Sequence, residues 1–155
     1  MEAKHFFGKF DVSHSVFAKS DNAIAIYNIA PIVPGHVMLV PLRQVESLKE
    51  FSEEELASFF SFARTITNFL VEEFNAAGFD WIIQDGRAAG QTVPHLHLHI
   101  IPRHEGDFPE PGDWYPALEK SKEITIDSEN RYRLTIEETE KIVSHLKQRW
   151  SYFLS

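Results

Sequence analysis

Residues 91–99 read QTVPHLHLH, and this stretch decides how the rest of the chain is interpreted. His95, His97 and His99 are two residues apart and alternate with leucines, and Ile100 continues the pattern. An alternation of period two predicts a strand with one buried face and one polar face. The three imidazoles are therefore expected to project in one direction, with His97 about 6.6 Å from each neighbour along the backbone.

Three roles are compatible with this spacing. Zinc requires three or four nitrogen or sulfur ligands in a tetrahedron, whereas one strand supplies two and the chain has no cysteine, so zinc is disfavoured. A merely solvated strand face is disfavoured because three histidines stand in register beside a proline and a Gly-Gln-Thr turn. The remaining role is catalytic, since a neutral imidazole is a good nucleophile near neutral pH and forms covalent intermediates.

The segment HLHLHII at 95–101 resembles the histidine triad superfamily of nucleotidyl hydrolases and transferases. Neighbouring segments resemble its fragile histidine triad branch, which cleaves dinucleoside polyphosphates. These segments are PIVPGHV at 31–37, PLR at 41–43, QDG at 84–86, AGQTV at 89–93, PR at 102–103 and GDF at 106–108. The resemblance extends from about residue 16 to residue 118 and is weaker in the C-terminal helix.

The resemblance implies an α+β fold with an antiparallel sheet of about five strands, one long central helix and a C-terminal helix. A length of 155 residues, with 43% hydrophobic and 25% charged residues, is typical of one ordinary globular core. We therefore expect a single domain over residues 1–155, with its core at about 16–118.

The central helix and the strands around it have clear local signals. Residues 16–19 and 22–28 are expected to form a hairpin, and residues 36–41 and 79–84 two further strands. Ser52 and Glu55 predict a capping box at the start of the helix, and Gly78 is placed to end it. Its core stripe is Leu56, Phe59, Phe60, Ala63, Thr67, Leu70 and Phe74, widened by Phe62, Ile66 and Phe69.

That stripe is wider than one sheet face usually covers, which predicts a partner subunit. The family's homodimer agrees with this expectation.

Beyond the triad, residues 103–131 contain three of the eight prolines without a clear period, so we expect a long loop. Trp114 and Tyr115 in it either stack on a base or fix the loop to the core. Thr135 and Glu138 predict a second capping box and a terminal helix over 135–152. Its packing stripe is Ile136, Ile142, Val143, Leu146, Trp150 and Phe153.

The predicted catalytic residues are the triad itself. As a hypothesis, Nε2 of His97 attacks phosphorus while an acceptor, most simply a backbone carbonyl, holds the Nδ1 proton. His95 orients the reacting group, and His99 together with the Gln91 and Thr92 loop donates to phosphoryl oxygens where charge develops. The predicted substrate-binding residues, several of them carried over by the resemblance, are Asn28, His36, Gln84, Gly90, Gln91, Thr92, Val93 and His99.

Charge and composition restrict the partners. A net charge of −8 and a pI near 5.4 disfavour long nucleic acid and anionic membranes, but not a small nucleotide. The absence of cysteine, of a signal-peptide pattern and of eighteen consecutive apolar residues predicts a cytoplasmic protein. No acidic cage is evident, so we expect no tightly bound cofactor, although Mg²⁺ accompanies polyphosphates.

The leading functional prediction is a diadenosine polyphosphate hydrolase that releases AMP. The purine nucleoside phosphoramidase branch usually follows its triad with Gly-Gly, where this chain has Pro102-Arg103, and uridylyltransferases have glutamine at the position of His99. Zinc-finger relatives that repair adenylated DNA are disfavoured by the missing cysteines. The sequence is also compatible with a nucleotide-binding signalling protein with slow turnover. It does not determine the preferred polyphosphate length, the preferred base, or whether residues 103–131 close over the site.

Overall fold

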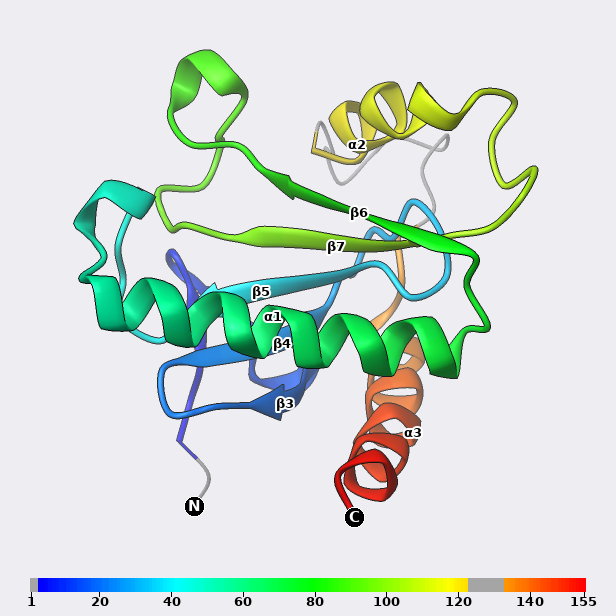
Figure 1. Ribbon diagram of the computed structural model, residues 1–155, viewed down its shortest axis with the longest axis horizontal. Coiled ribbons are helices and arrows are strands. Elements are labelled where there is room, and N and C mark those ends of the chain that lie inside the picture. Colours follow the sequence, from blue (N-terminus) through cyan, green and yellow to red (C-terminus); the bar gives the residue numbers. More distant parts are fainter. Residues whose placement is uncertain (1–2, 123–132) are drawn as a thin grey trace.

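The computed structural model describes residues 3–122 and 133–155. A five-stranded antiparallel sheet of order β3-β4-β5-β7-β6 forms its centre (Figure 1). The strands are β3 (Val16–Lys19), β4 (Ala23–Tyr27), β5 (Val37–Pro41), β6 (Gly78–Ile83) and β7 (Leu98–Arg103), and the helices are α1 (Glu53–Glu73), α2 (Trp114–Lys122) and α3 (Ile136–Leu154). The expected α+β fold with a five-stranded sheet, a long helix and a C-terminal helix is confirmed.

Helix α1 crosses one face of the sheet and begins as its sequence predicts (Figure 1). The Ser52 hydroxyl accepts a hydrogen bond from the Glu55 amide, and the Glu55 carboxylate accepts one from the Ser52 amide. The expected end at Gly78 is wrong. The helix ends at Glu73, and Asn75, with φ of 49°, takes the left-handed conformation that usually favours glycine, while Gly78 opens β6.

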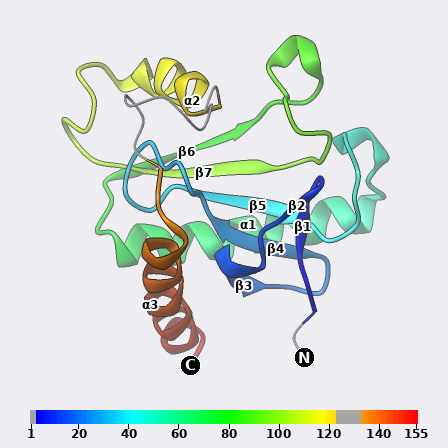
Figure 2. The same cartoon turned by 180° about the vertical axis from the view of Figure 1, so that it is seen from behind.

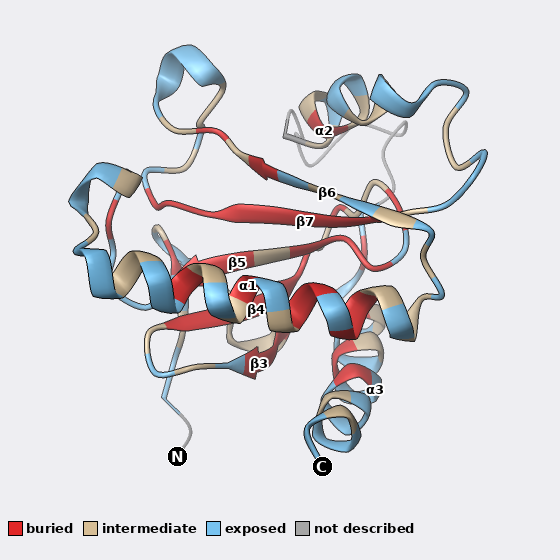
Figure 3. Ribbon diagram, in the orientation of Figure 1, coloured by how far each residue is buried: buried red, intermediate tan, exposed pale blue. Residues whose placement is uncertain are grey.

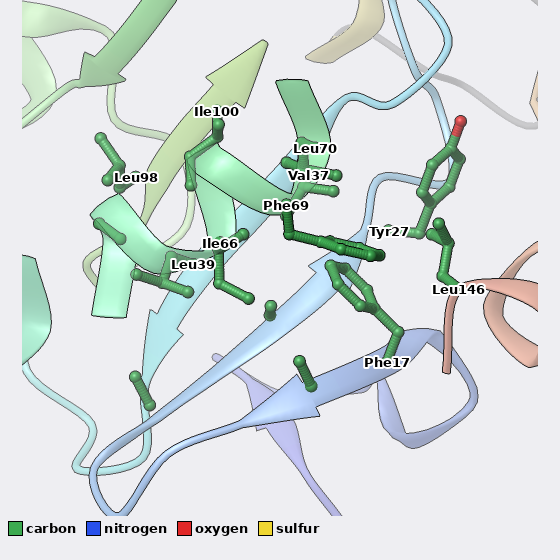
Figure 4. Packing of buried hydrophobic residues seen from close by; sticks show 14 of the residues in the cluster. Phe17, Tyr27, Val37, Leu39, Ile66, Phe69, Leu70, Leu98, Ile100 and Leu146 are labelled. Atoms are coloured by element: carbon green, nitrogen blue, oxygen red, sulfur yellow. The ribbon is translucent and has the colours of Figure 1, made fainter. Parts of the chain in front are cut away.

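The main core lies between the sheet, α1 and α3 (Figure 4). Inward-facing strand residues such as Leu39, Leu98 and Ile100 meet α1 there. Phe69 of α1 also contacts Trp150 and Phe153 of α3, with ring centroids 5.3 and 5.5 Å away. One side of the wide α1 stripe is thus covered by the chain's own C-terminal helix, so its width alone does not require a partner subunit.

The opposite face of the sheet is covered by a short hairpin, β1 (Phe6–Phe7) and β2 (Phe10–Asp11), and by α2 (Figure 2). Phe7 packs with buried residues of β3, β4 and β5, and Leu118 of α2 packs on Ile82 and Ile101. Both faces of the central strands are therefore buried (Figure 3).

The expectation of a structureless loop over residues 103–131 is wrong for its middle part. Residues 111–113 form a short 3₁₀ turn and α2 follows it directly. Pro111 and Pro116 each lie in a first helical turn, where the missing amide has no intrahelical partner to lose. Trp114 packs against the cluster around Ile101, whereas Tyr115 is exposed. The part of the expected loop from 123 to 131 lies outside the described residues.

The C-terminal helix has the expected capping box between Thr135 and Glu138. Its buried residues are Thr139, Val143 and Leu146, so the expected burial of Ile136, which is 65% exposed, is wrong. None of the helices within the described ranges is long and apolar enough to cross a membrane.

The triad segment forms a shorter strand than the sequence predicts. Ladder pairing begins at Leu98, so only His99 belongs to β7, while His95 and His97 precede it. The polar face that they form is also buried, in agreement with the argument against a merely solvated strand face, because His95, His97 and His99 are 2%, 6% and 3% exposed. The hairpin β1–β2 covers this face, and its Phe7 contacts the rings of His95 and His97.

Candidate active site

His97 is held in one tautomer by the backbone of its own segment. Its Nδ1 atom lies 3.0 Å from the carbonyl oxygen of His95. Because a carbonyl oxygen only accepts, Nδ1 carries the proton and donates it, and the lone pair of the neutral ring is on Nε2. The ring stands edge-on to Phe7 and to His99, each with a centroid distance of 4.9 Å. The backbone acceptor that the chemistry of a nucleophilic imidazole requires is therefore present.

His95 has both ring nitrogens bonded to backbone groups. The amide of Gly8 donates to Nδ1 over 3.0 Å, and Nε2 donates to the carbonyl of Pro41 over 2.9 Å. Burial lowers the pKa of His95 below its ordinary value of 6.5, although the Pro41 carbonyl opposes this shift. With no remaining lone pair, His95 is suited to positioning and not to nucleophilic attack or metal binding.

His36 and His99 form a second chain of donors behind the triad. The Ile32 amide donates to Nδ1 of His36 over 3.2 Å, so the His36 proton is on Nε2, which lies 2.9 Å from Nδ1 of His99. Because Nδ1 of His99 accepts this hydrogen bond, the proton of the neutral His99 ring is on Nε2. Burial, with a smaller contribution from His97, lowers the pKa of His36 to about 3, so His36 is neutral at physiological pH.

Asn28 lies directly after β4 and is also buried against His36. Its Oδ1 atom accepts a hydrogen bond from the Ala30 amide. Its Nδ2 atom lies 3.3 Å from Nε2 of His36, but both nitrogens carry protons in the tautomer set by the Ile32 amide, so this contact is not a hydrogen bond. The structure thus brings Asn28 and His36 together with the triad, as the sequence predicted. His36 is completely buried, which favours a supporting role behind His99 over direct contact with a substrate.

Gln84 follows β6 and faces the same side of the sheet as His99. Ile82 lies opposite His99 in the ladder, and Gln84 is two residues further on. The Nε2 atom of Gln84 donates to the Glu119 carboxylate of α2 over 3.2 Å. A side chain at Gly90, where φ is 98°, would come within 2.8 Å of the Gln84 amide. Gln84 and Gly90 therefore pack together beneath α2.

The loop before the triad is tied together by Gln91. Its Oε1 atom accepts from the Gly86 amide, and its Nε2 atom donates to the carbonyls of Glu46 and Val93. The Gln91 side chain is thus occupied in holding the loop, although the sequence suggested that it donates to phosphate. Thr92 is exposed, and Val93 packs against the N-terminal hairpin near Gly8.

No metal site is built from these groups. Over residues 3–122 and 133–155, no three His, Asp or Glu side chains gather so as to hold a metal ion. In this arrangement both nitrogens of His95 and Nδ1 of His97 are engaged in hydrogen bonds and are unsuited to bind a metal ion.

Several residues at the site were not identified from the sequence. Phe7 and Gly8 contact the triad from a hairpin some 87 residues away, and Glu119 reaches Gln84 from α2. The only sequence signal for the hairpin is a glycine between aromatic residues, which is too short to indicate a contact partner.

The comparisons with known proteins agree with this geometry. The model of the HIT domain family matches residues 9–106. The chain is 41% identical over 122 residues to a bis(5'-nucleosyl)-tetraphosphatase (asymmetrical) of Schizosaccharomyces pombe, covering 79% of this chain and 67% of the relative. It is 38% identical over 119 residues to a bis(5'-adenosyl)-triphosphatase of Dictyostelium discoideum, covering 76% and 80%.

Among solved structures, the chain resembles the diadenosine triphosphate hydrolase of Plasmodium falciparum in complex with cyclomarin A. The TM-score is 0.77 at 26% identity, and the match covers 100% of this chain and 89% of that one.

The buried neutral state of His36 predicts how stability depends on pH. Between pH 6.5 and about 3 the unfolded chain binds a proton that the folded ring excludes, so the free energy of unfolding falls as pH falls. His36 alone contributes a slope of about 1.4 kcal/mol per pH unit in this window. Urea unfolding from pH 7 to pH 4 measures it.

In His36→Gln the contribution of His36 to the pH dependence of the unfolding free energy disappears, whereas the control His5→Gln retains it. Equal slopes for wild type and His36→Gln would contradict a neutral buried imidazole.

Proposed function

The chain belongs to the HIT domain family, and from this membership we propose that it hydrolyses dinucleoside polyphosphates of the diadenosine tri- and tetraphosphate type. The names of the two relatives, both hydrolases of such compounds, support this substrate class. The products are AMP and the remaining nucleotide. The partner at the site is a small nucleotide, and the lack of cysteine supports the cytoplasmic location that we propose for the protein.

The observation that carries the proposal is the bond from Nδ1 of His97 to the His95 carbonyl. In the first step Nε2 of His97 attacks the phosphorus that bears one nucleoside. An N–P bond forms, the bridging P–O bond breaks, and the remaining nucleotide leaves with the bonding electron pair. The ring of the intermediate is cationic, and the His95 carbonyl stabilises its Nδ1–H.

In the second step water attacks the same phosphorus and the N–P bond breaks. Its electron pair returns to Nε2 of His97, a proton goes to solution, and AMP is released. The Nε2–H of His99, set by its bond from His36, donates to the phosphoryl oxygen where negative charge develops. Two displacements at one phosphorus predict net retention of configuration.

Substitution of the nucleophile tests this mechanism. His97→Asn should lower turnover of diadenosine triphosphate by on the order of 10⁴-fold or more, because no other group in the cluster offers an equivalent lone pair. Substrate binding, measured by calorimetry, should stay close to that of wild type. Chromatography of the products distinguishes AMP plus ADP from the amine that a phosphoramidase would release.

The control His145→Asn replaces a histidine on α3, outside the cluster, and should leave turnover unchanged. A His97→Asn protein that retains turnover would contradict the assignment.

We also propose that Mg²⁺ reaches the site with the polyphosphate and not as a resident ion. A cation between the phosphates neutralises charge on the leaving group. Chelation should therefore lower the rate, and added Mg²⁺ should restore it fully, without a change in the melting temperature of the protein. A metal that survives extensive dialysis against chelator and is needed for activity would contradict this proposal.

We further propose that two copies associate through the edge strand β6. In the described part of the chain β6 pairs only with β7, so its other edge is open. Phe79 and Trp81 on this strand are 49% and 37% exposed, with ring centroids 5.9 Å apart, and Phe60 of α1 continues the row at 6.0 Å from Trp81. A second copy is a natural occupant because an antiparallel edge can pair with itself across a two-fold axis.

Phe79→Lys should weaken this association by at least about tenfold, because an exposed aromatic anchor is replaced by a charge at the pairing edge. Sedimentation velocity over a concentration series measures the dissociation constant. The matched control Tyr115→Lys changes an exposed aromatic residue of α2 and should have no effect. A wild-type protein that stays monomeric at every concentration would contradict the proposal.

A further inference from the structure

We propose that Gly8 is a positioning residue of the reaction, because its backbone amide fixes the ring of His95 and thereby the carbonyl that holds His97. The N-terminal hairpin β1–β2 then contributes to the geometry of the active site in addition to packing on the core. This inference rests on the proposed function, since it concerns the same nucleophile.

The first observation is that the His95 ring is clamped from two distant parts of the chain. The Gly8 amide donates to Nδ1 from the hairpin, and the Pro41 carbonyl accepts from Nε2 at the end of β5. An amide is always a donor and a carbonyl always an acceptor, so the two contacts together permit one tautomer and one ring orientation.

The second observation is that ladder pairing does not hold His95 in place. The pairing of β7 with β5 and β6 begins at Leu98, three residues later. The backbone here is fixed by isolated bonds, from the His95 amide to the Val93 carbonyl and from the Leu96 amide to the Val45 carbonyl. The Leu96 amide lies in the same planar peptide as the His95 carbonyl, so its bond sets the tilt of that carbonyl. The clamped ring fixes the position of His95, from which the carbonyl extends to accept the His97 Nδ1–H.

The third observation is that position 8 accepts only glycine without strain. Its φ is 60°, and a Cβ atom there would lie 2.9 Å from Cγ1 of Val93. The close approach of the hairpin to residue 93 is what brings the amide within hydrogen-bonding distance of Nδ1. Phe7 then lies edge-on to His97 at 4.9 Å and tilted against His95 at 5.7 Å, so the hairpin contacts the nucleophile as well.

Gly8→Ala tests the inference, because the added methyl group pushes the hairpin away from Val93. We expect kcat to fall on the order of 10²-fold, with a much smaller change in KM, since small displacements of a reacting group have effects of this size. The ¹⁵N signals of labelled histidine should show His95 leaving its single Nε2–H tautomer. These spectra are recorded on the full chain without substrate.

Gly8→Ala/Val93→Ala removes the obstructing methyl groups and should recover part of both kcat and the His95 signature. If Gly8→Ala alone fails to fold, kcat and the His95 signals are measured on this double variant instead. Phe10→Ala on the exposed part of the same hairpin should behave as wild type. Val93→Ala alone is the reference with which the double variant is compared. Partial rescue of kcat and of the His95 signature relative to Gly8→Ala, together with the unchanged Phe10→Ala control, supports the inference.

The inference is overturned if Gly8→Ala retains kcat, or if kcat falls while the His95 spectrum stays that of wild type. It is also overturned if the folded double variant recovers neither property. A wild-type protein without activity on dinucleoside polyphosphates would remove the proposed function instead. The imidazole spectra would then still decide whether the hairpin fixes His95.

Discussion

The hydrogen bond from Nδ1 of His97 to the His95 carbonyl is the interaction on which the chemistry of this site depends. A histidine ring has two nitrogens, and because Nδ1 of His97 donates to this carbonyl, only Nε2 can offer a lone pair to phosphorus. Backbone groups make that choice for three of the rings. The Gly8 amide and the Pro41 carbonyl fix the His95 proton, the Ile32 amide fixes that of His36, and the His95 carbonyl fixes that of His97. His36 in turn fixes the proton of His99, so that four neighbouring imidazoles are organised without a carboxylate.

Burial has two consequences for these rings. It lowers the pKa of His36 and His95, which favours the neutral form of both supporting imidazoles. It also makes hydrogen-bond partners important for the ring nitrogens, since an unsatisfied buried polar atom is unfavourable. The hydrophobic clusters on both faces of the sheet supply the burial. Backbone groups bond the rings of His36, His95 and His97, and the ring of His36 bonds that of His99. The packing of the hydrophobic clusters therefore also determines the protonation of the histidines at the site.

Sequence reasoning identified the sheet, α1, α3 and the residues of the triad because these depend on local periodicity and capping. His36 and Asn28 were predicted to bind substrate, partly by resemblance, and the structure places His36 beside His99 and Asn28 beside His36, while their role in binding stays a prediction. The role of Gly8 was not predictable, since a contact between an amide and a ring 87 residues later leaves no local pattern. Helix α2 was missed because Pro116, and Pro111 just before the helix, indicate a loop unless their place in a first helical turn is known. Gln91 was assigned to phosphate because nothing in the sequence shows that the carbonyls of Glu46 and Val93 use its amide group.

Neutron diffraction from a perdeuterated crystal at neutral pH tests the assignment of these protons most directly. The account predicts deuterium on Nδ1 and not on Nε2 of His97, and on Nε2 and not on Nδ1 of both His95 and His36. Deuterium on Nε2 of His97, alone or together with Nδ1, would contradict it, because the ring would then have no lone pair to offer to phosphorus.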